Sequence, residues 1–249
     1  MSGDFSNGRD PIPLGRAFDT PESKRRYVQG LFTTISGRYD FITRFLSFGR
    51  DRHWKSRVLD LADLTPGRRV LDLASGTGDL AFGAADCGAA VIGLDLTPRM
   101  VERARARRAL GKSGSLTWVV GDMTRLPIPS ATVDVVTCGY GLRNVPDLPA
   151  AVAEIHRVLK PGGRLCALDF DRPESPVVRA IYLAYLEVVG GTLGWMLHGD
   201  SETYRYIPAS IRRYPGAKGV CDLLRRGGFS DVRHVPVLGG LMAIHVADR

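Results

Sequence analysis

The feature that most constrains the fold is a regular alternation of short apolar runs with helical segments between residues 70 and 170. The runs have the length of buried strands, and the segments between them carry apolar residues at helical spacing. Such alternation is typical of a parallel sheet covered by helices on both faces. We therefore predict an α/β fold with strands at Val70–Ala74, Ala90–Asp95, Leu116–Gly121, Val133–Gly139 and Arg164–Phe170.

The flanking regions follow a different pattern. Residues 22–62 and 172–215 are predicted to be helical elaborations on the sheet, and residues 1–20 are predicted to form a loose tail. Near the C-terminus, Gly239 and Gly240 separate two strand-like runs and predict a hairpin, which adds an antiparallel strand. We expect a single domain over residues 21–249, with further helices at Leu80–Cys87, Pro98–Leu110, Leu148–Leu159, 174–197 and Ala217–Gly227, and strands at Phe229–Leu238 and Gly240–Asp248.

Composition excludes several classes of protein. The apolar fraction of 44% and the charged fraction of 24% are those of a globular chain. The net charge of +8 permits an anionic partner, but the four arginines between residues 103 and 108 point in several directions on a helix. This favours a solvated face over a nucleic-acid footprint. The four cysteines stand far apart and the histidines lack ligand spacing, so we predict no disulfide, no metal and a cytoplasmic protein.

The sharpest local motif is residues 70–79, Val-Leu-Asp-Leu-Ala-Ser-Gly-Thr-Gly-Asp, in which a strand runs into a glycine-rich turn and then a helix. Three interpretations compete. The turn is an ordinary connection, or it binds a dinucleotide through Gly76 and Gly78, or it binds S-adenosylmethionine (SAM). Acid placement separates the last two, because Asp72 and Asp79 would repel a pyrophosphate but attract the cationic sulfonium and α-amine of SAM.

Two further acids favour SAM. Asp95 closes the second strand, where a carboxylate can accept the ribose hydroxyls. Asp122 closes the third strand, where it can receive the adenine amino group beside the soft side chain of Met123. Open α/β sheets bind ligands at the carboxyl ends of their strands. We predict that SAM binds there through Asp72, Ala74, Gly76, Thr77, Gly78, Asp95, Leu96, Asp122, Met123 and Gly139.

These segments, with Leu159-Lys160-Pro161-Gly162-Gly163 before the fifth strand, resemble the class I SAM-dependent methyltransferases. A narrower resemblance, to the ubiquinone/menaquinone biosynthesis C-methyltransferases, covers nearly the whole chain. It is carried by Tyr39-Asp40, Leu46-Ser47-Phe48-Gly49, Trp54, Gly141-Leu142-Arg143-Asn144-Val145, Arg157-Val158-Leu159-Lys160-Pro161-Gly162-Gly163-Arg164-Leu165, Tyr204-Arg205-Tyr206 and Ser210-Ile211. The resemblance implies a Rossmann-like class I methyltransferase sheet and an enzyme that methylates a ring carbon of a prenylated quinol.

This chain departs from the family pattern in places. The departures, each with the usual family residue, are Ile42 and Thr43 (Met-Asn), Asp51 (His), Gly139 (often Ser), Tyr140 (Phe) and Asp169-Phe170-Asp171 (Glu-x-Ser). They do not threaten the cofactor fold. They leave open the choice between benzoquinol and naphthoquinol, and they admit a diverged relative that methylates another aromatic or lipidic small molecule.

Methylation of a ring carbon needs an aligned nucleophile, a group that stabilises phenolate and a route for the phenol proton. Arg143 and Asn144 follow the fourth strand and are our candidate catalytic residues. Arg143 can stabilise the phenolate charge, and because a guanidinium is a poor direct base we expect the proton to leave through water. The alternative is a structural arginine held by an acid such as Asp147. His53 and His198 are further candidate bases.

The substrate side is predicted from aromatic and apolar segments. The candidate substrate-binding residues are Tyr39, Tyr140, Tyr204, Arg205 and Tyr206, with ordinary packing as the alternative. Residues 181–197 can line a channel for a prenyl tail or touch the inner face of an anionic membrane, and a core or homodimer helix is the alternative. Glycines and Glu187 interrupt this stretch, which we expect to be too short to span a bilayer.

Two functions from other classes remain open. The basic composition permits an RNA or protein methyltransferase, but the sequence carries no aromatic-studded basic stripe. A non-catalytic scaffold that binds SAM or lipid is the other, and the complete set of predicted cofactor acids speaks against it.

Overall fold

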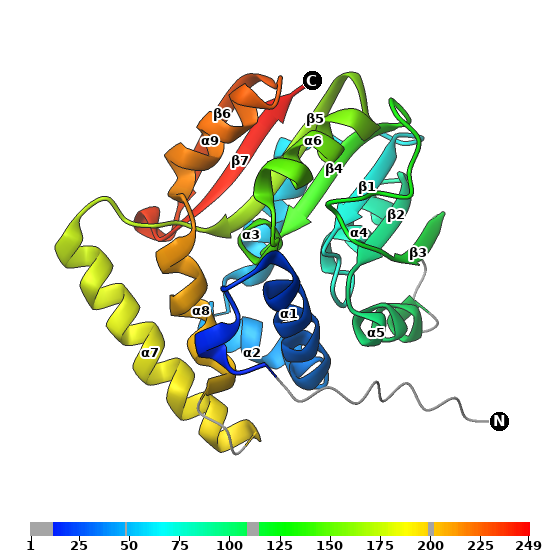
Figure 1. Ribbon diagram of the computed structural model, residues 1–249. Coiled ribbons are helices and arrows are strands. Elements are labelled where there is room, and N and C mark those ends of the chain that lie inside the picture. Colours follow the sequence, from blue (N-terminus) through cyan, green and yellow to red (C-terminus); the bar gives the residue numbers. More distant parts are fainter. Residues whose placement is uncertain (1–11, 48, 109–114, 199–201) are drawn as a thin grey trace.

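Figure 1 shows the computed structural model, which describes residues 12–47, 49–108, 115–198 and 202–249. The strands within these residues are β1 (Arg69–Leu73), β2 (Ala90–Asp95), β3 (Leu116–Val120), β4 (Val133–Gly139), β5 (Leu159–Phe170), β6 (Ser230–Val237) and β7 (Met242–Asp248). They form one sheet in the order β3-β2-β1-β4-β5-β7-β6. The first five strands are parallel, and β7 is antiparallel to both of its neighbours. The predicted mostly parallel sheet with an antiparallel hairpin strand is confirmed.

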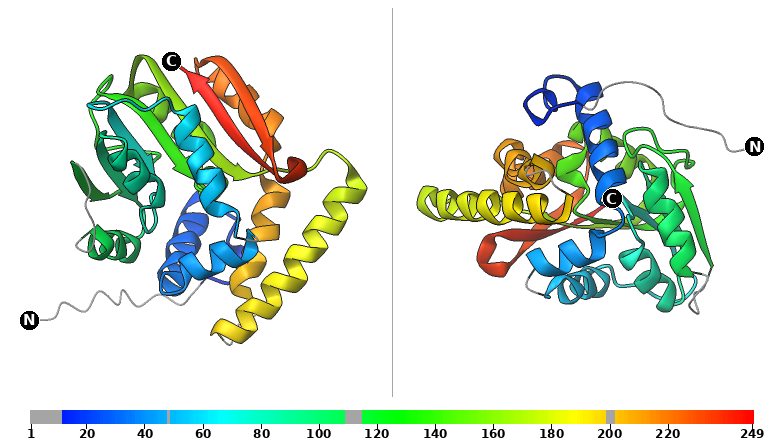
Figure 2. Two further views of the ribbon diagram at one scale, coloured as in Figure 1. Left: turned by 180° about the vertical axis from the view of Figure 1, so that it is seen from behind. Right: turned by 90° about the horizontal axis from the view of Figure 1, so that it is seen from below.

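Helices cover both faces of the sheet. The described helices are α1 (Pro21–Ile35), α2 (Tyr39–Leu46), α3 (Asp51–Leu61), α4 (Asp79–Asp86), α5 (Pro98–Arg108), α6 (Leu148–Val158), α7 (Pro176–His198), α8 (Glu202–Arg213) and α9 (Gly216–Arg226), with short 3-10 helices η1 (Leu14–Arg16), η2 (Leu142–Asn144) and η3 (Leu238–Gly240). Helices α3, α4 and α5 lie on one face of the sheet, and α6 and α9 lie on the other (Figure 2). Their buried side chains belong to two separate apolar clusters. The core therefore consists of two apolar layers with the sheet between them.

The fifth strand begins earlier than the sequence predicts. β5 starts at Leu159, and Gly162 and Gly163 lie inside it instead of forming a separate turn. The backbone N–H of Gly162 donates to the carbonyl of Arg249, and the N–H of Arg249 donates to the carbonyl of Gly163. The C-terminal residue therefore supplies the ladder partners that the glycines would lack in an isolated turn.

The tail is ordered over part of the range predicted to be loose. Residues 1–11 lie outside the described residues, but Ala17 is fully buried and the Phe18 ring stacks on Tyr206 with 5.7 Å between centroids. Thr20 caps α1, because its hydroxyl accepts the N–H of Ser23 and the Ser23 hydroxyl accepts that of Thr20. The packed part of the chain thus begins before residue 21.

The two helical elaborations meet over the carboxyl ends of the parallel strands, below the sheet in Figure 1. Their contact is an apolar cluster that contains Ile35 of α1, Ile42 of α2, Leu193 of α7 and Tyr204 of α8. Helices α1, α2, α7 and α8, from two distant parts of the sequence, therefore form one helical cover, called the roof below. It lies over the edge of the sheet where ligands bind in this kind of fold.

α7 is longer than the apolar stretch picked out from the sequence. Residues 176–197 form 22 helical residues that are long and apolar enough to cross a membrane, so the expectation that this segment is too short was wrong. The helix meets this criterion by length and composition, and 39% of its apolar window is buried inside the protein. Tyr182, Leu183 and Leu186 pack with Ile211 of α8. One face of α7 is thus buried against α8.

Candidate active site

The glycine-rich turn after β1 is shaped by two different demands. Gly76 has φ of +54°, and its N–H donates to Asp95 Oδ2 at 2.8 Å. Gly78 has φ of +94°, and a Cβ there would lie 2.5 Å from the Trp118 ring and 2.8 Å from Phe82. Gly76 lines the cavity at the strand ends, and Gly78 is not among the described residues that line it. The absence of a side chain at Gly78 leaves room for Trp118 of β3 and Phe82 of α4.

Thr77 is also engaged within the protein. Its hydroxyl donates to Asp40 Oδ1 at 2.6 Å, which ties the turn to α2. The ring of Tyr39 stands beside it, 3.8 Å from where a Cβ of Gly76 would be. These contacts place Tyr39 and Asp40 of α2 over the turn.

Asp95 and Asp122 stand at the ends of adjacent strands, and both line the same cavity. The Asp95 oxygens accept the N–H groups of Gly76 and Thr97, each at 2.8 Å. Each oxygen keeps a second lone pair for a ligand hydroxyl. Asp122 accepts from Thr124 through Oδ1 and lies 3.1 Å from Arg25 of α1 through Oδ2. Both carboxylates are thus held in fixed orientations toward the cavity.

Asp72 and Asp79, which the sequence grouped together, have different surroundings. Asp72 is 1% exposed; Oδ1 accepts the Thr137 hydroxyl at 2.7 Å, and Oδ2 has no hydrogen-bond partner in the described part of the chain. Burial raises the pKa of its carboxyl to about 7. Asp79 instead pairs with Lys55 and Arg107, each at 2.8 Å. Asp72 is therefore the acid left available for a cation, and Asp79 is not.

The cavity at the strand ends has the lining that SAM requires. Its other predicted residues are all present in the wall: Ala74, Leu96, Met123 and Gly139. Asn144 lines the same cavity, and its buried Oδ1 has no hydrogen-bond partner within the described residues. Asp72 is not among the described residues of that wall; it lines a small pocket of about 20 Å³ that shares Ala74, Gly76 and Gly139 with the cavity. Unpaired buried acceptors are costly, so Asn144 Oδ1 in the cavity and Asp72 Oδ2 in the adjoining pocket each fit a ligand donor. The site fits a zwitterionic, cationic nucleoside such as SAM.

The first helix contributes walls that the sequence did not reveal. Val28 and Phe32 of α1 line the cofactor cavity, and the Gln29 side chain donates to the Leu96 carbonyl at 3.3 Å. Lys24 donates to the carbonyls of Arg143 and Val145, at 2.9 and 2.6 Å. Apolar spacing predicts that such a helix has a buried face, but it does not say which loop that face covers.

Arg143 forms a buried ion pair with Asp169 rather than with Asp147. Its Nη1 lies 2.6 Å from Asp169 Oδ1, and its backbone N–H donates to Oδ2 of the same carboxylate. Asp147 instead caps α6 by accepting the N–H of Ala150. The guanidinium lies 4.6 Å from the centroid of the Phe170 ring, and Asp169 raises its pKa despite its burial. Arg143 is therefore a fixed cation.

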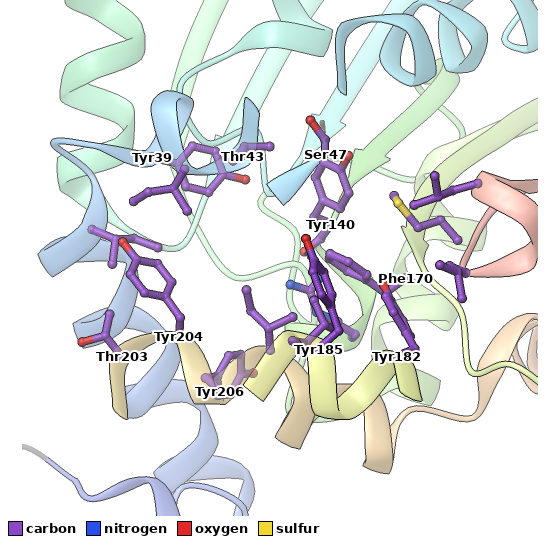
Figure 3. Close-up of a pocket in the computed structure, with 18 of the residues that line it drawn as sticks. Tyr39, Thr43, Ser47, Tyr140, Phe170, Tyr182, Tyr185, Thr203, Tyr204 and Tyr206 are labelled. Carbon is purple, nitrogen blue, oxygen red and sulfur yellow. Dashed lines mark hydrogen bonds between the residues drawn. The ribbon is translucent and has the colours of Figure 1, made fainter. Parts of the chain in front are cut away.

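A second, larger cavity of about 550 Å³ lies under the helical roof. Figure 3 shows its aromatic wall, to which Tyr39, Tyr140, Tyr204 and Tyr206 all contribute. Among the described lining residues, Arg143 is the only charged one. Arg205, which was also predicted to bind substrate, is exposed beside Trp195 and is not among the described residues that line this cavity.

The cavity also contains residues that sequence reasoning did not single out as site residues. Phe170 is the last residue of β5, and Tyr182 and Tyr185 belong to α7. The two α7 tyrosines appeared in the sequence only as members of a possible tail channel. Tyr39 and Tyr140 line this cavity and the cofactor cavity alike, so the two spaces meet at these rings.

Neither cavity has a histidine among its described lining residues. His53 is exposed on α3 and lines neither cavity. The side chain of His198 lies outside the described residues. The His156 ring contacts the Phe229 ring edge to face, with 5.1 Å between centroids, so it packs α6 against the residue before β6. The described part of the site thus offers no histidine to take the phenol proton.

The architecture matches solved methyltransferases. A putative methyltransferase in complex with the Trm112 activator of Haloferax volcanii has a TM-score of 0.63 with 20% identity, covering 87% of this chain and 96% of its own. A Thermotoga maritima SAM-dependent methyltransferase also has a TM-score of 0.63, at 19% identity, with coverage of 88% and 98%. At this identity the likeness concerns the fold. The shared fold, the cavity at the strand ends and a match to a methyltransferase family together define a SAM-dependent methyltransferase.

Residues 20–249 match the model of the ubiE/COQ5 methyltransferase family, and the chain belongs to that family. It is 39% identical over 221 residues to a demethylmenaquinone methyltransferase of Thermus thermophilus, covering 88% of this chain and all of that protein. It is 36% identical over 251 residues to the ubiquinone/menaquinone biosynthesis C-methyltransferase UbiE of Methylobacterium nodulans, covering 98% and 95%. The family resemblance inferred from the sequence is therefore confirmed.

Proposed function

We propose that this enzyme transfers a methyl group from SAM to a ring carbon of a demethylated prenyl quinol, in menaquinone or ubiquinone biosynthesis. The main support for this proposal is the cavity of about 550 Å³ beside the cofactor cavity. Its wall is aromatic and apolar and contains one fixed cation, Arg143. An apolar wall suits a prenylated ring, and a single buried cation suits the one negative charge that a quinol acquires when it becomes a nucleophile. The names of the relatives carry the same assignment.

In this proposal each residue has a distinct task. SAM supplies a methyl group already activated by its sulfonium. Arg143 stabilises the phenolate oxygen, and its ion pair with Asp169 fixes the guanidinium before substrate arrives. Asn144 donates its amide N–H to the Tyr140 carbonyl at 2.8 Å, which presents its free Oδ1 to the cofactor side. Tyr39 and Tyr140 then hold the substrate ring where the two cavities meet.

The test is a mass-spectrometric assay with SAM and a panel of short-tailed demethylated benzoquinols and naphthoquinols, each run with and without reductant. We expect one methyl group to be added to a ring carbon only under reducing conditions, because the oxidised quinone is electron-poor and cannot attack. The preferred ring would identify the substrate. No product from any quinol, with SAM binding intact, would leave a diverged methyltransferase of another aromatic or lipidic small molecule.

The buried carboxyl of Asp72 is expected to make SAM affinity depend on pH. Its pKa of about 7 means that it is neutral at lower pH, where it no longer attracts the cationic cofactor. Affinity should therefore weaken as pH falls below 7, approaching about tenfold per pH unit. Calorimetric titrations between pH 5.5 and 8.5 measure this slope. Asp72→Asn should bind weakly at every pH, and a flat profile for the wild-type chain would contradict the assignment.

In the same proposal α7 rests on the inner face of the membrane. Val177, Ile181, Val188, Trp195 and Met196 are each 67–69% exposed and lie along one side of the helix. Ile181 and Tyr185 also line the substrate cavity, so the cavity wall continues into this exposed apolar face. A prenyl tail could then leave the cavity along the surface that touches lipid. Because its other face packs on α8, the helix lies on the bilayer.

Vesicle sedimentation tests this placement. The double variant Val188→Glu/Trp195→Glu, on the exposed face and outside the substrate cavity, should bind phosphatidylglycerol-containing vesicles at least about tenfold more weakly. Its turnover of a water-soluble short-tailed quinol should be unchanged. Val120→Glu, at an exposed apolar site on β3, is the matched control. Unaltered vesicle binding together with dissociation of a dimer would show instead that the face is a subunit interface.

A further inference from the structure

Two of the departures from the family pattern meet in space. Asp51 opens α3 and Tyr140 follows β4, 89 residues later, yet the Tyr140 hydroxyl donates to Asp51 Oδ1 at 2.7 Å. The two side groups are buried, with Asp51 6% exposed and Tyr140 8% exposed. The bond therefore joins the start of α3 to the loop after β4.

Asp51 is oriented by an ion pair and a hydrogen bond. Lys55, one helical turn further along α3, places Nζ 2.7 Å from Asp51 Oδ2 and 2.8 Å from Asp79. The Asp51 backbone N–H donates to the Ser47 hydroxyl at 3.2 Å. Asp51 also lines a polar cavity of about 340 Å³, together with Lys55, Asp79 and Arg107. A proton that reaches Asp51 thus has a polar route away from the apolar cavity.

Tyr140 stands between the substrate and cofactor cavities. Its backbone is held in an uncommon left-handed conformation with φ of +60°, fixed by the bond from its N–H to the Leu168 carbonyl at 2.7 Å. Figure 3 shows the ring between Ser47 and the tyrosines of α7. Because the hydroxyl gives its only proton to Asp51, its lone pairs remain to accept one from a substrate hydroxyl.

Arg143, the only charged residue among the described residues that line the substrate cavity, cannot take the proton of the substrate hydroxyl. Arg143 is bound to Asp169 at 2.6 Å, and that carboxylate raises its pKa, so it stays protonated. Burial and the neighbouring Asp51 carboxylate raise the pKa of Tyr140 well above its usual value. Tyr140 therefore acts at neutral pH as a hydroxyl that passes a proton on, and not as a tyrosinate.

We propose that Tyr140 and Asp51 form a proton relay that activates the quinol, an inference that rests on the proposed function. The substrate hydroxyl gives its proton to Tyr140 Oη while Tyr140 gives its own to Asp51 Oδ1, which leaves a phenolate beside Arg143. The ring carbon then bonds to the methyl carbon as the S–CH₃ bond breaks and its electrons pass to sulfur. The ring C–H proton leaves to water, and Asp51 returns its proton to the ring oxygen through Tyr140.

The relay releases one proton for each methyl group transferred. Tyr140 is a catalytic residue in this scheme, because its hydroxyl touches the substrate. Asp51 acts through Tyr140, and Lys55 positions Asp51.

The experiment first establishes turnover of a reduced quinol by the wild-type chain and then compares Tyr140→Phe, Asp51→Asn and the double variant. Each single change should lower kcat about 100-fold, within the range for general base catalysis. KM and the Kd for SAM should stay within about twofold of wild type. The double variant should be no slower than either single one, because the groups act in series. Tyr214→Phe, at a buried tyrosine outside both cavities, is the matched control.

A second substrate distinguishes a role of Tyr140 and Asp51 in proton transfer from a purely structural role. A ring-fluorinated quinol has a more acidic hydroxyl and needs less help from a base, so the ratio of wild-type to variant kcat should shrink with it. A ratio that is the same for both substrates would overturn the relay, as would a Tyr140→Phe variant that keeps its kcat. A wild-type chain inactive on every quinol would overturn the proposed function itself, and the relay with it.

Discussion

Replacing Asp95 by alanine is expected to raise the Kd for SAM about 10³-fold. The carboxylate can accept both ribose hydroxyls while it holds the N–H groups of Gly76 and Thr97. Hydrogen bonds to a charged group contribute about 1.5–3 kcal/mol each, so the loss of two corresponds to about three orders of magnitude. Calorimetry with SAM or its demethylated product measures the change directly.

The control for this variant is Asp95→Asn, which keeps one carbonyl oxygen and the size of the side chain. Its Kd for SAM should lie between that of the wild-type chain and that of Asp95→Ala. Thermal melting without ligand would show whether the turn between β1 and α4 remains folded. If SAM affinity were unchanged in Asp95→Ala, the cavity at the ends of β1 to β4 would not be the cofactor site.

Replacing Arg143 by alanine is expected to lower kcat about 10³-fold while SAM affinity changes little. A preorganised donor aimed at a developing negative charge contributes roughly 10²–10³ in rate, and Arg143 is the only charged residue among the described residues that line the substrate cavity. Asn144, rather than Arg143, lines the cofactor cavity, which is why binding and turnover should separate. Single-turnover assays on a reduced quinol measure the rate.

The Arg143→Ala change leaves Asp169 buried without its cationic partner. Such breakage of a buried ion pair costs about 3–5 kcal/mol of stability. The double variant Arg143→Ala/Asp169→Asn removes the stranded charge and should regain stability without regaining turnover. Arg157→Ala, which breaks the pair with Glu154 on α6 away from the cavities, is the matched control. Turnover retained by Arg143→Ala would make this arginine a structural residue.

The cofactor half of the site could be predicted because its determinants are local. Parallel strands bring their carboxyl ends to one edge, so a residue's place at the end of an apolar run also gives its place in space. The order of runs and acids in the sequence is enough to assign Asp95, Asp122 and Met123 to that edge, and all three line the cofactor cavity. The exception is Gly78, whose role depends on Trp118, a residue from a different strand.

The substrate half could not be predicted to the same extent, because it depends on contacts between distant segments. Nothing near Arg143 in the sequence indicates that its acid is Asp169, 26 residues away. Arg205 lies between two buried tyrosines, and only the packing of α8 against its neighbours determines which side chains point inward. Hydrophobic periodicity specifies a buried face but not the element it faces.

The roof over the strand ends has a consequence for how such enzymes diversify. The cofactor cavity is built mainly from the ends of β1 to β4 and from α1, whereas α7 and α8 contribute only to the substrate cavity. Mutations in α7 and α8 can therefore reshape the acceptor pocket without altering methyl-donor binding. Selection can retain one half of the molecule while exploring the other, so a lineage can acquire a new acceptor without first losing its donor.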